Sequence, residues 1–380
     1  MKNIKNENEF GTILINDFQE LEKLSKIYNI PVSELLQMDL NRCGIYLPNG
    51  EVQEKFRVRF KAKILDDYET WVALPVRSKD NTPYYTKDNK IYFKNCEIGL
   101  AKELELDTCD TSYQRGPYLL NLNSRSRSSC GGCKACIHNY HDLYNSTVIK
   151  DRLSLNTKED IENYFIKMKF DIKKFNQLAV VTGLFRDEDH VVNHMKLVHE
   201  VANEMGFNGE LMYFGCQVNS DKVLIELSKL GNFYLIYALD NFLKRDKLLS
   251  KLKLSITIET AKDTLTRAKK LGIKTSISYI CGIDNLNDMI KGFENIKESL
   301  TNFPIINIYQ MQTNEQASIL DNNAKSLDFY IKSRIGIEEL FKDTSLRPKR
   351  WENYRPLWYK YFSDEELPNN SFGQLEKNGE

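Results

Sequence analysis

The sequence predicts an α/β protein in which a parallel sheet is covered by helices. From about residue 116 onward, continuous apolar runs alternate with segments of helical periodicity, which is typical of strands buried on both faces and separated by helices. A shorter region before residue 116 has the alternating pattern of half-buried strands instead. These observations predict six βα units preceded by a small β-rich domain.

The six predicted strands lie at 118–123, 178–182, 210–215, 233–239, 275–282 and 305–311. The intervening helices are predicted at 188–205, 222–230, 260–271 and 287–300. Six units of this kind form either a partial TIM-type barrel or an open doubly wound sheet. In both architectures we expect the active site at the C-terminal ends of the strands.

The N-terminal region is organised differently. Residues 1–10 are polar, and 17–37 carry apolar residues at helical spacing. In 55–63, apolar residues alternate with cations, which predicts a strand with one basic face. Further strands, predicted at 70–76 and 90–93, make 40–110 a β-rich unit. The basic face could meet an anionic substrate, a precursor peptide or RNA, or simply solvent.

Composition excludes several classes of protein. The chain has 380 residues, of which 41% are hydrophobic and 28% charged, so disorder and fibrous repeats are excluded. The 53 basic residues balance the 53 acidic ones, and no global charge favours nucleic acid or an anionic membrane. No apolar run has the length of a membrane span, and the first ten residues are too polar for a signal peptide. We therefore expect a cytoplasmic protein with no membrane partner.

Three of the eight cysteines, Cys130, Cys133 and Cys136, lie within seven residues, in a glycine-containing loop after the first predicted strand of the array. Three thiolates so close together can converge on one soft metal centre. A ferredoxin run would place a fourth cysteine at the position of Tyr140. Three ligands leave one iron of a four-iron cluster open to bind a small molecule, which is the property of a catalytic cluster.

Zinc is the alternative metal, with His138 or His141 completing a Cys3His set. On that interpretation the chain is a zinc-stabilised binding protein. The basic strand at 55–63 and the mixture of cations and aromatic residues at 347–360 would then hold RNA or an acidic partner.

The position of the three cysteines resembles that of the radical SAM enzymes, although the spacing here is C-x-x-C-x-x-C and the usual family motif is C-x-x-x-C-x-x-C. From about 116 to 342 the chain is similar to the biotin synthase-like branch of that superfamily. The similarity rests on Tyr237-Ala238-Leu239-Asp240, Gly272-Ile273-Lys274, Ile280-Cys281-Gly282-Ile283, Ile306-Asn307-Ile308 and residues 324–341, in the family's order.

The resemblance implies a set of residues for S-adenosylmethionine (SAM). Asp240 corresponds to the carboxylate that holds the ribose, and Gly282 lies in the segment near the adenine. Thr182 and Gly183 stand where the family receives the methionyl amino group. Glu259, with Lys262 one turn away, could reach the SAM carboxylate region, and Asn307 on the sixth strand is a further candidate.

The sulfur-donating second cluster of biotin synthase is not implied. Residues 179–182 lack its strand-two cysteine, and Ser276 occupies the strand-five position. Cys216 near the third strand cannot hold such a cluster alone. A biotin synthase type of sulfur insertion is therefore disfavoured.

The resemblance thus implies a partial (βα)6 barrel of the radical SAM type. A [4Fe-4S] cluster on Cys130, Cys133 and Cys136 would cleave SAM to a 5′-deoxyadenosyl radical that abstracts hydrogen from a substrate. A separate flavodoxin or ferredoxin would supply the electron, because no second cysteine-rich motif and no flavin or nicotinamide fingerprint is present. The expected domains are 1–115 (accessory), 116–345 (barrel) and 346–380 (tail). The substrate, whether small molecule, peptide or nucleotide, stays open.

Overall fold

The structure is a computed structural model of the chain and describes residues 7–48, 57–65, 69–106, 113–116, 118–124, 132–136, 155–349, 352–353 and 355–368. The chain divides into two compact units. The first unit comprises Met1–Asp107, Ile280–Glu294 and Ile305–Ser371, and the second comprises Thr108–Tyr279, Asn295–Pro304 and Phe372–Glu380.

The larger sheet has seven strands in the order β12-β11-β10-β9-β8-β7-β6. Its strands are β6 (Tyr113–Gly116), β7 (Leu119–Leu122), β8 (Gln177–Val181), β9 (Glu210–Gly215), β10 (Phe233–Asp240), β11 (Lys274–Cys281) and β12 (Ile305–Ile308). Strands β7 to β11 pair in parallel, whereas β6 is antiparallel to β7.

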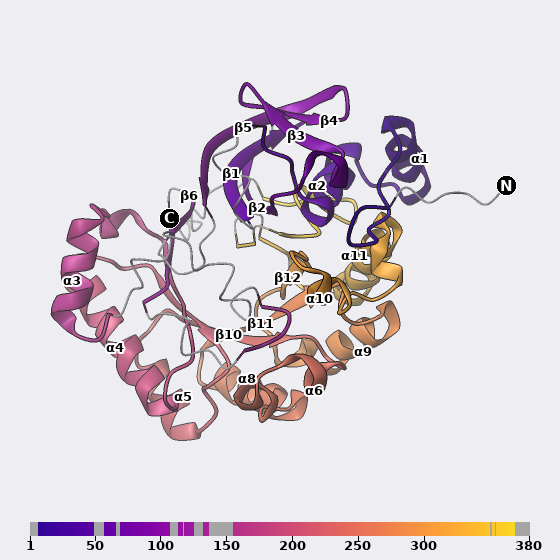
Figure 1. The fold of residues 1–380 in the computed structure, drawn as a ribbon. Coiled ribbons are helices and arrows are strands. Elements are labelled where there is room, and N and C mark those ends of the chain that lie inside the picture. The colour runs from indigo at the N-terminus through magenta and orange to yellow at the C-terminus, as the bar shows by residue number, and fades with distance from the viewer. Residues whose placement is uncertain are drawn as a thin grey trace. The chain divides into compact units, whose positions relative to one another are not determined.

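The order of β7 to β12 follows the chain without a reversal. A doubly wound sheet reverses its strand order at a switch point, so the sequential order identifies the barrel type of sheet. The six predicted strands are present, each within a few residues of its expected bounds. The predicted fold class, a partial six-stranded parallel barrel with a small β-rich region, is confirmed (Figure 1).

Helices of the second unit alternate with its strands and lie on the outer side of the sheet (Figure 1). They are α3 (Lys158–Lys167), α4 (Glu188–Glu204), α5 (Asp221–Ser228) and α8 (Ile258–Lys270), with the short α6 (Arg245–Leu248) and α7 (Lys251–Leu254) after β10. The four longer helices begin after Thr157, Asp187, Ser220 and Thr257. Each of these side chains accepts a backbone N–H of the first turn, which fixes where the helix starts.

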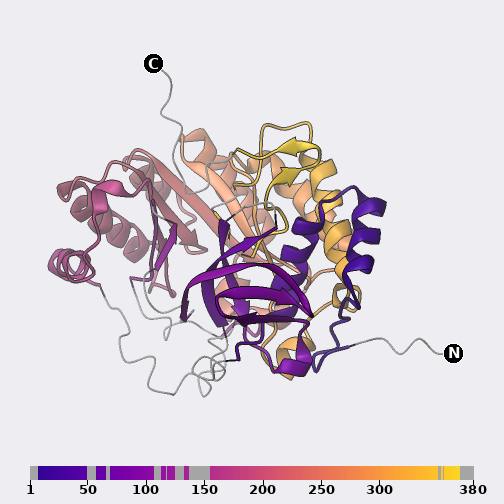
Figure 2. The ribbon, with the colours of Figure 1, turned by 90° about the horizontal axis from the view of Figure 1, so that it is seen from above.

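The first unit contains a five-stranded antiparallel sheet in the order β2-β1-β5-β4-β3. Its strands are β1 (Arg57–Ile64), β2 (Glu69–Pro75), β3 (Tyr84–Lys87), β4 (Lys90–Phe93) and β5 (Cys96–Leu106). Figure 2 shows these strands in purple and the helices α1 (Phe18–Tyr28) and α2 (Val32–Cys43) in indigo.

The helical periodicity of 17–37 belongs to two helices, not one. Asn29 ends α1 in the left-handed conformation, with φ of 53°, and Pro31 precedes α2 as its N-cap residue. The residue before a proline avoids the helical region, and proline removes a backbone donor, so one helix cannot run through this point.

The remaining α-helices of the C-terminal half are α9 (Leu286–Ile296), α10 (Asn314–Ala317) and α11 (Leu327–Phe341), followed by the short hairpin β13 (Tyr361–Phe362) and β14 (Glu365–Glu366). Single turns of 3-10 helix occur at Lys79–Asn81, Ile172–Lys174, Lys297–Ser299 and Asn323–Lys325.

The cations of β1 have partners within the first unit. Arg59 pairs with Glu105 at 2.8 Å and Lys61 pairs with Glu103 on β5. The Lys61 ammonium also lies 5.4 Å from the ring centre of Trp71. These contacts show that Arg59 and Lys61 take part in cross-strand pairing, which leaves their face of β1 less positive than the sequence suggested.

The aromatic residues of the C-terminal tail are packed inward where they are described. Trp358 and Tyr359 are buried, and the Trp358 indole donates to Glu338 at 2.8 Å. The Arg347 guanidinium lies 4.8 Å from the ring centre of Phe362. The binding-protein alternative requires aromatic rings that are exposed for stacking on nucleic-acid bases. Trp358 and Tyr359 are buried and do not meet this requirement.

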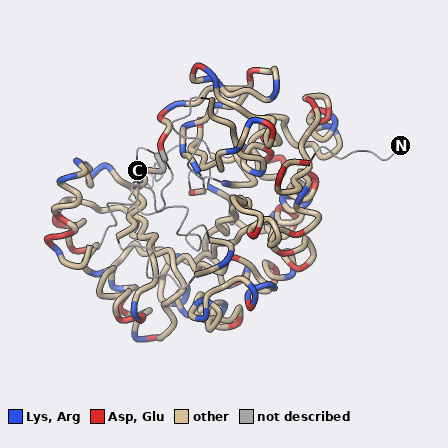
Figure 3. Tube along the Cα trace, viewed as in Figure 1, with Lys and Arg blue, Asp and Glu red and all other residues tan. Residues whose placement is uncertain are grey.

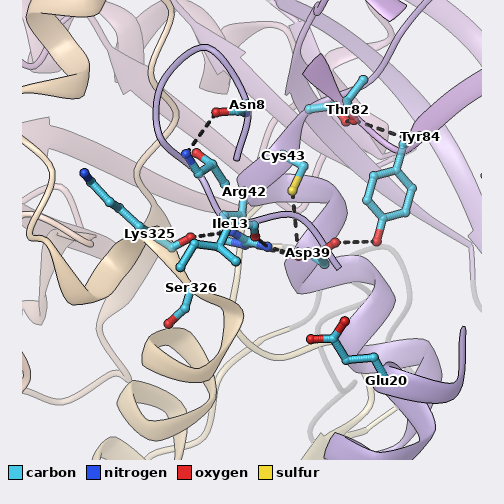
Figure 4. Close-up of polar contacts among 12 residues, drawn as sticks. Asn8, Ile13, Glu20, Asp39, Arg42, Cys43, Thr82, Tyr84, Lys325 and Ser326 are labelled. Atoms are coloured by element: carbon cyan, nitrogen blue, oxygen red, sulfur yellow. Dashed lines mark hydrogen bonds and ion pairs between the residues drawn. The ribbon is translucent and has the colours of Figure 1, made fainter. Parts of the chain in front are cut away.

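A buried network in the first unit joins α2 to its surroundings (Figure 4). Arg42 pairs with Asp39 and donates to the carbonyls of Ile13 at 2.9 Å and Lys325 at 2.8 Å. The other Asp39 oxygen accepts from the Tyr84 hydroxyl at 2.8 Å. Burial raises the pKa of Tyr84 well above its usual range, so this hydroxyl stays a donor at neutral pH.

Figure 3 shows acidic and basic residues interspersed along the helices, while the strands β8 to β10 carry few of either. Within the part of the chain that the structure describes, no helix combines the length and the apolar character needed to cross a membrane.

Candidate functional site

The described part of the cysteine loop is 132–136. The side chains of Cys133 and Cys136 are half-buried, and the Cys136 amide donates to the Cys133 carbonyl at 2.9 Å, which forms one tight turn. Gly132 precedes them with φ of +77°, a conformation that glycine adopts without strain. The predicted ligand Cys130 and the alternative zinc ligands His138 and His141 lie outside the described residues.

Two hydrogen bonds from main-chain amides attach this turn to the segment that follows β10. The Lys134 amide donates to the Leu248 carbonyl at 2.8 Å, and the Ser250 amide donates to the Cys133 sulfur at 3.3 Å. The loop after β7 and the segment after β10 therefore meet within the second unit. This places the thiol of Cys133 near the C-terminal end of β10.

The path of that segment is set by Asp240 and Arg245. Asp240 ends β10 with φ of +67°, a left-handed conformation that aspartate tolerates better than most residues. The buried Arg245 guanidinium then donates to four backbone carbonyls, those of Leu239, Asn241, Lys253 and Ile256, at 2.6 to 3.2 Å. These bonds hold α6 and α7 against the end of the strand.

As a result, Lys253 returns to Asp240 and forms an ion pair with it. Both side chains are 16% exposed. Burial by itself lowers the pKa of Lys253, but the charge of Asp240, with smaller contributions from Cys216 and Cys133, raises it above the ordinary value. Lys253 is therefore a cation throughout the neutral range, and Asp240 is held in place.

Cys216 lies next to these groups, directly after β9. It is buried, and burial raises the pKa of its thiol to about 11, with the charges of Lys253, Asp240 and Cys133 also acting on it. We refer to Cys133, Cys216, Asp240 and Lys253 as the Asp240 group. It lies at the C-terminal ends of β9 and β10, which is where barrel folds carry their chemistry.

Thr182 and Gly183 lie in the loop after β8, in the same unit. Thr182 is half-buried and Gly183 is buried. The Gln217 side chain fixes this loop, because its oxygen accepts the Phe185 amide at 2.7 Å and its nitrogen donates to the Phe185 carbonyl at 2.8 Å. Gln217 directly follows Cys216, so the loops after β8 and β9 are joined.

Glu259 is exposed on the first turn of α8. None of the recorded hydrogen bonds or ion pairs of the described residues links it to the Asp240 group. Lys262, one turn further on, donates to Asn295 at 2.8 Å. The role of Glu259 stays a prediction.

Gly282 and Asn307 belong to the first unit. Gly282 follows β11 with φ of +115°, and a Cβ there would come within 2.9 Å of the Tyr330 hydroxyl. Asn307 on β12 is buried, and among the described residues its side-chain oxygen has no hydrogen-bond partner. A buried acceptor without a partner is costly, so this atom is suited to receive a polar ligand.

The two histidines in the first two turns of α4, four positions apart, have separate partners. His190 bonds to Asp187 at 2.6 Å on the exposed first turn of α4. His194 is buried and lies 2.6 Å from the Ser124 hydroxyl, just after β7. Among the described residues, no group of three His, Cys, Asp or Glu side chains could hold a metal ion.

Sequence reasoning missed Ser250, Lys253 and Arg245. Lys253 is the partner of Asp240 thirteen positions earlier, and no periodic pattern connects the two. Lys253 comes close to Asp240 because Arg245 donates to four backbone carbonyls around the intervening segment. Cys216 was noted in the sequence for its position at a strand end, and the structure places it in the Asp240 group.

The donor set of the described turn fits an iron–sulfur cluster. Cys133 and Cys136 lie three positions apart in one turn and are accessible to solvent in part. Thiolates are the ligands that iron–sulfur clusters take. Together with Cys130, these two residues would hold the cluster.

No protein-family model matches the chain, and no curated protein matches it. The chain is similar to several solved structures, including the following three. The SAM-bound SuiB of Streptococcus suis has 12% identity, with a TM-score of 0.38 over 61% of this chain and 49% of SuiB. The coproporphyrinogen III oxidase HemN of Escherichia coli, a radical SAM enzyme by its description, has 16% identity and a TM-score of 0.36 over 50% and 48%.

The FeFe-hydrogenase maturase HydG of Carboxydothermus hydrogenoformans has 15% identity and a TM-score of 0.42 over 61% of this chain and 54% of HydG. The chain thus spans about half the length of each of these three proteins. With TM-scores below 0.5, these similarities carry no argument about its activity. The proposal below rests on the residues of the chain itself.

Proposed function

We propose that this protein is a radical SAM enzyme. Cys130, Cys133 and Cys136 hold a [4Fe-4S] cluster through three thiolates, and SAM binds beside it at the ends of the barrel strands. The observation that carries the proposal is the attachment of the Cys133 turn to the segment after β10. The half-buried thiol of Cys133 lies close to Asp240, the residue matched to the ribose-binding carboxylate, which supports this proposal.

The surroundings of Asp240, Thr182 and Gly183 support a role for each of them in binding SAM. Asp240 accepts hydrogen bonds from hydroxyl groups of the ribose, while its ion pair with Lys253 keeps the carboxylate oriented. Thr182 and Gly183 present a loop edge to the methionyl amino group, and Gln217 keeps that loop rigid. Gly282 and Asn307 serve the adenine side and Glu259 the carboxylate side, as the resemblance to the biotin synthase-like branch implies.

When bound, the cluster and SAM together supply a 5′-deoxyadenosyl radical that abstracts hydrogen from a substrate. The share of the protein is to hold SAM and substrate in line and to exclude water. The Asp240 group contributes by burial, because Cys216 is 4% exposed and the Asp240 and Lys253 side chains are 16% exposed. A separate flavodoxin or ferredoxin supplies the electron.

The proposal includes the division into accessory domain 1–115, barrel 116–345 and tail 346–380. It also includes a cytoplasmic location and a substrate bound with help from the accessory domain. The zinc-stabilised binding protein is the weaker candidate. Its basic strand is engaged by Glu103 and Glu105, and Trp358 and Tyr359 of its aromatic tail are buried.

The experiment is SAM cleavage by anaerobically reconstituted protein reduced with dithionite. The wild-type protein should release 5′-deoxyadenosine, and Cys133→Ala should release none. The matched control is Cys96→Ala, because Cys96 is an exposed thiol on β5 with no part in the site. Cleavage that persists in Cys133→Ala at the wild-type rate would show that the thiol has another role.

A further inference from the structure

We infer that the backbone amide of Ser250 is a hydrogen-bond donor to the cluster ligand Cys133 and raises the reduction potential of the cluster. Ser250 is thus a positioning residue that acts through Cys133. This inference rests on the proposed function and deepens it, because it names a residue outside the cysteine loop that regulates how readily the site accepts an electron.

The contact is specific in the structure. The Ser250 nitrogen lies 3.3 Å from the Cys133 sulfur, and the parallel bond from the Lys134 amide to the Leu248 carbonyl, at 2.8 Å, fixes the register of the two segments. Ser250 is 6% exposed, so water competes little for this donor. The bond comes from the main chain and does not depend on the identity of the Ser250 side chain.

The donor is also held in place from its own side. Arg245 binds carbonyls on both sides of residue 250, at Leu239 and Asn241 before it and at Lys253 and Ile256 after it. The Ser250 hydroxyl accepts from the Lys253 amide at 3.4 Å. The amide of Ser250 is therefore aimed at the sulfur by a rigid segment and not by a flexible side chain.

The chemical effect follows from charge. Reduction adds an electron to a cluster that is already anionic, and the added charge is shared by its thiolate ligands. An N–H that donates to a ligand sulfur stabilises the more negative state, so it raises the potential. Loss of the bond should make the site harder to reduce without removing any ligand.

The decisive comparison changes one atom. Ser250→Ala keeps the amide N–H at this position. In the second variant, lactic acid replaces Ser250 and is introduced by suppression of a stop codon. Lactic acid has the same methyl side chain as alanine, but an ester oxygen takes the place of the N–H. The midpoint potential of each reconstituted protein is measured by redox titration followed by electron paramagnetic resonance. We expect a more negative potential for the ester than for Ser250→Ala, and a nearly unchanged one for Ser250→Ala relative to wild type.

A second measurement does not depend on loading the ester variant. Protein labelled with ¹⁵N-serine is reduced, and the magnetic coupling between the cluster and nearby nitrogen is recorded by pulsed electron paramagnetic resonance. Because Ser250→Ala keeps the amide but removes its label, a ¹⁵N coupling present in the wild type and missing from Ser250→Ala identifies the Ser250 nitrogen.

The outcomes separate the two claims. Wild-type protein that shows no cluster signal and no bound iron would overturn the proposed function. A loaded cluster with no ¹⁵N coupling lost in Ser250→Ala, or with the same potential in the ester variant as in Ser250→Ala, would overturn this inference alone.

Discussion

Each unit of this protein buries a network of charged side chains, around Arg42 and Arg334 in the first unit and around Arg245 and Lys253 in the second. In the first unit both oxygens of Asp39 accept hydrogen bonds, from Arg42 and from Tyr84. In the second unit the Asp240 group keeps 16% exposure of its charged pair and lies beside a half-exposed thiol.

Arg334 forms a second buried network in the first unit, in which the charged groups are likewise paired with one another. It is 1% exposed, pairs with Glu34 and Glu338, and donates to the carbonyls of Leu357 at 3.2 Å and Tyr361 at 2.7 Å. The comparison indicates that the buried networks of the first unit join its segments. In the second unit the Asp240–Lys253 pair stays partly exposed, as the proposed ligand site requires. Residue type alone does not distinguish the two uses.

The largest expected effect tests the Arg334 network. Arg334→Met leaves the buried carboxylates of Glu34 and Glu338 without a cation, and we expect a loss of about 3–5 kcal/mol in the free energy of unfolding, measured by urea denaturation. The control is Lys332→Ala on the same helix, whose exposed pair with Asp328 should be worth less than about 1 kcal/mol. Equal losses in the two variants would contradict a structural role for the Arg334 network.

The next prediction concerns how fast the buried thiols are alkylated compared with an exposed one. Burial raises the pKa of Cys216 to about 11 and that of Cys281 to about 12. A raised pKa keeps the thiol protonated, so at pH 8 only about one Cys216 in a thousand is thiolate, against roughly a quarter of an ordinary thiol. In iron-free folded protein, iodoacetamide should label Cys216 at least about 100-fold more slowly than an ordinary thiol.

Mass spectrometry of the alkylated peptides measures this, with Cys96 as the exposed reference and urea-unfolded protein as the control in which all sites react. Labelling of Cys216 should accelerate only as the pH approaches 11. Rapid labelling of Cys216 at pH 8 in the folded protein would contradict the burial of this thiol within the Asp240 group.

The carboxylate of Asp240 is tested by Asp240→Asn, since asparagine also tolerates the left-handed backbone at this position. A hydrogen bond to a charged group is worth about 1.5–3 kcal/mol, so the affinity for SAM should fall by about 10- to 150-fold with the iron content unchanged. Equilibrium dialysis with labelled SAM measures it. Asp246→Asn, an exposed position on α6, should retain wild-type affinity, and a loss of similar size there would remove the special role of Asp240.

The smallest expected effect is at Asn29 in the first unit. Like Asp240, Asn29 has a left-handed backbone conformation, with φ of 53°. At Asn29 the conformation only ends a helix, so Asn29→Ala should destabilise the protein by about 1 kcal/mol and Asn29→Gly by less. Thermal unfolding of the pair measures it, and identical melting temperatures would argue against strain at this cap.

The fold was largely predictable from the sequence because parallel strands buried on both faces consist of continuous apolar runs, and β7 to β12 follow that pattern. The break between α1 and α2 was missed although Pro31 marks it, because the apolar spacing continues on both sides. At the candidate site, Cys133, Cys136 and Asp240 stay predictions from spacing and resemblance, although the structure brings Cys133 and Asp240 together. Ser250 and Lys253 could not be predicted, because the bonds of Arg245 to four carbonyls create their positions and leave no pattern in the sequence.

The central claim is that the cysteine loop holds a cluster and not a zinc ion. Its most direct test is metal analysis, with an absorption spectrum, of wild-type protein and Cys133→Ala purified without oxygen. The account predicts a brown wild-type protein that absorbs near 400 nm with about four irons per chain, and little iron in Cys133→Ala. A colourless wild-type protein with one zinc per chain would contradict it.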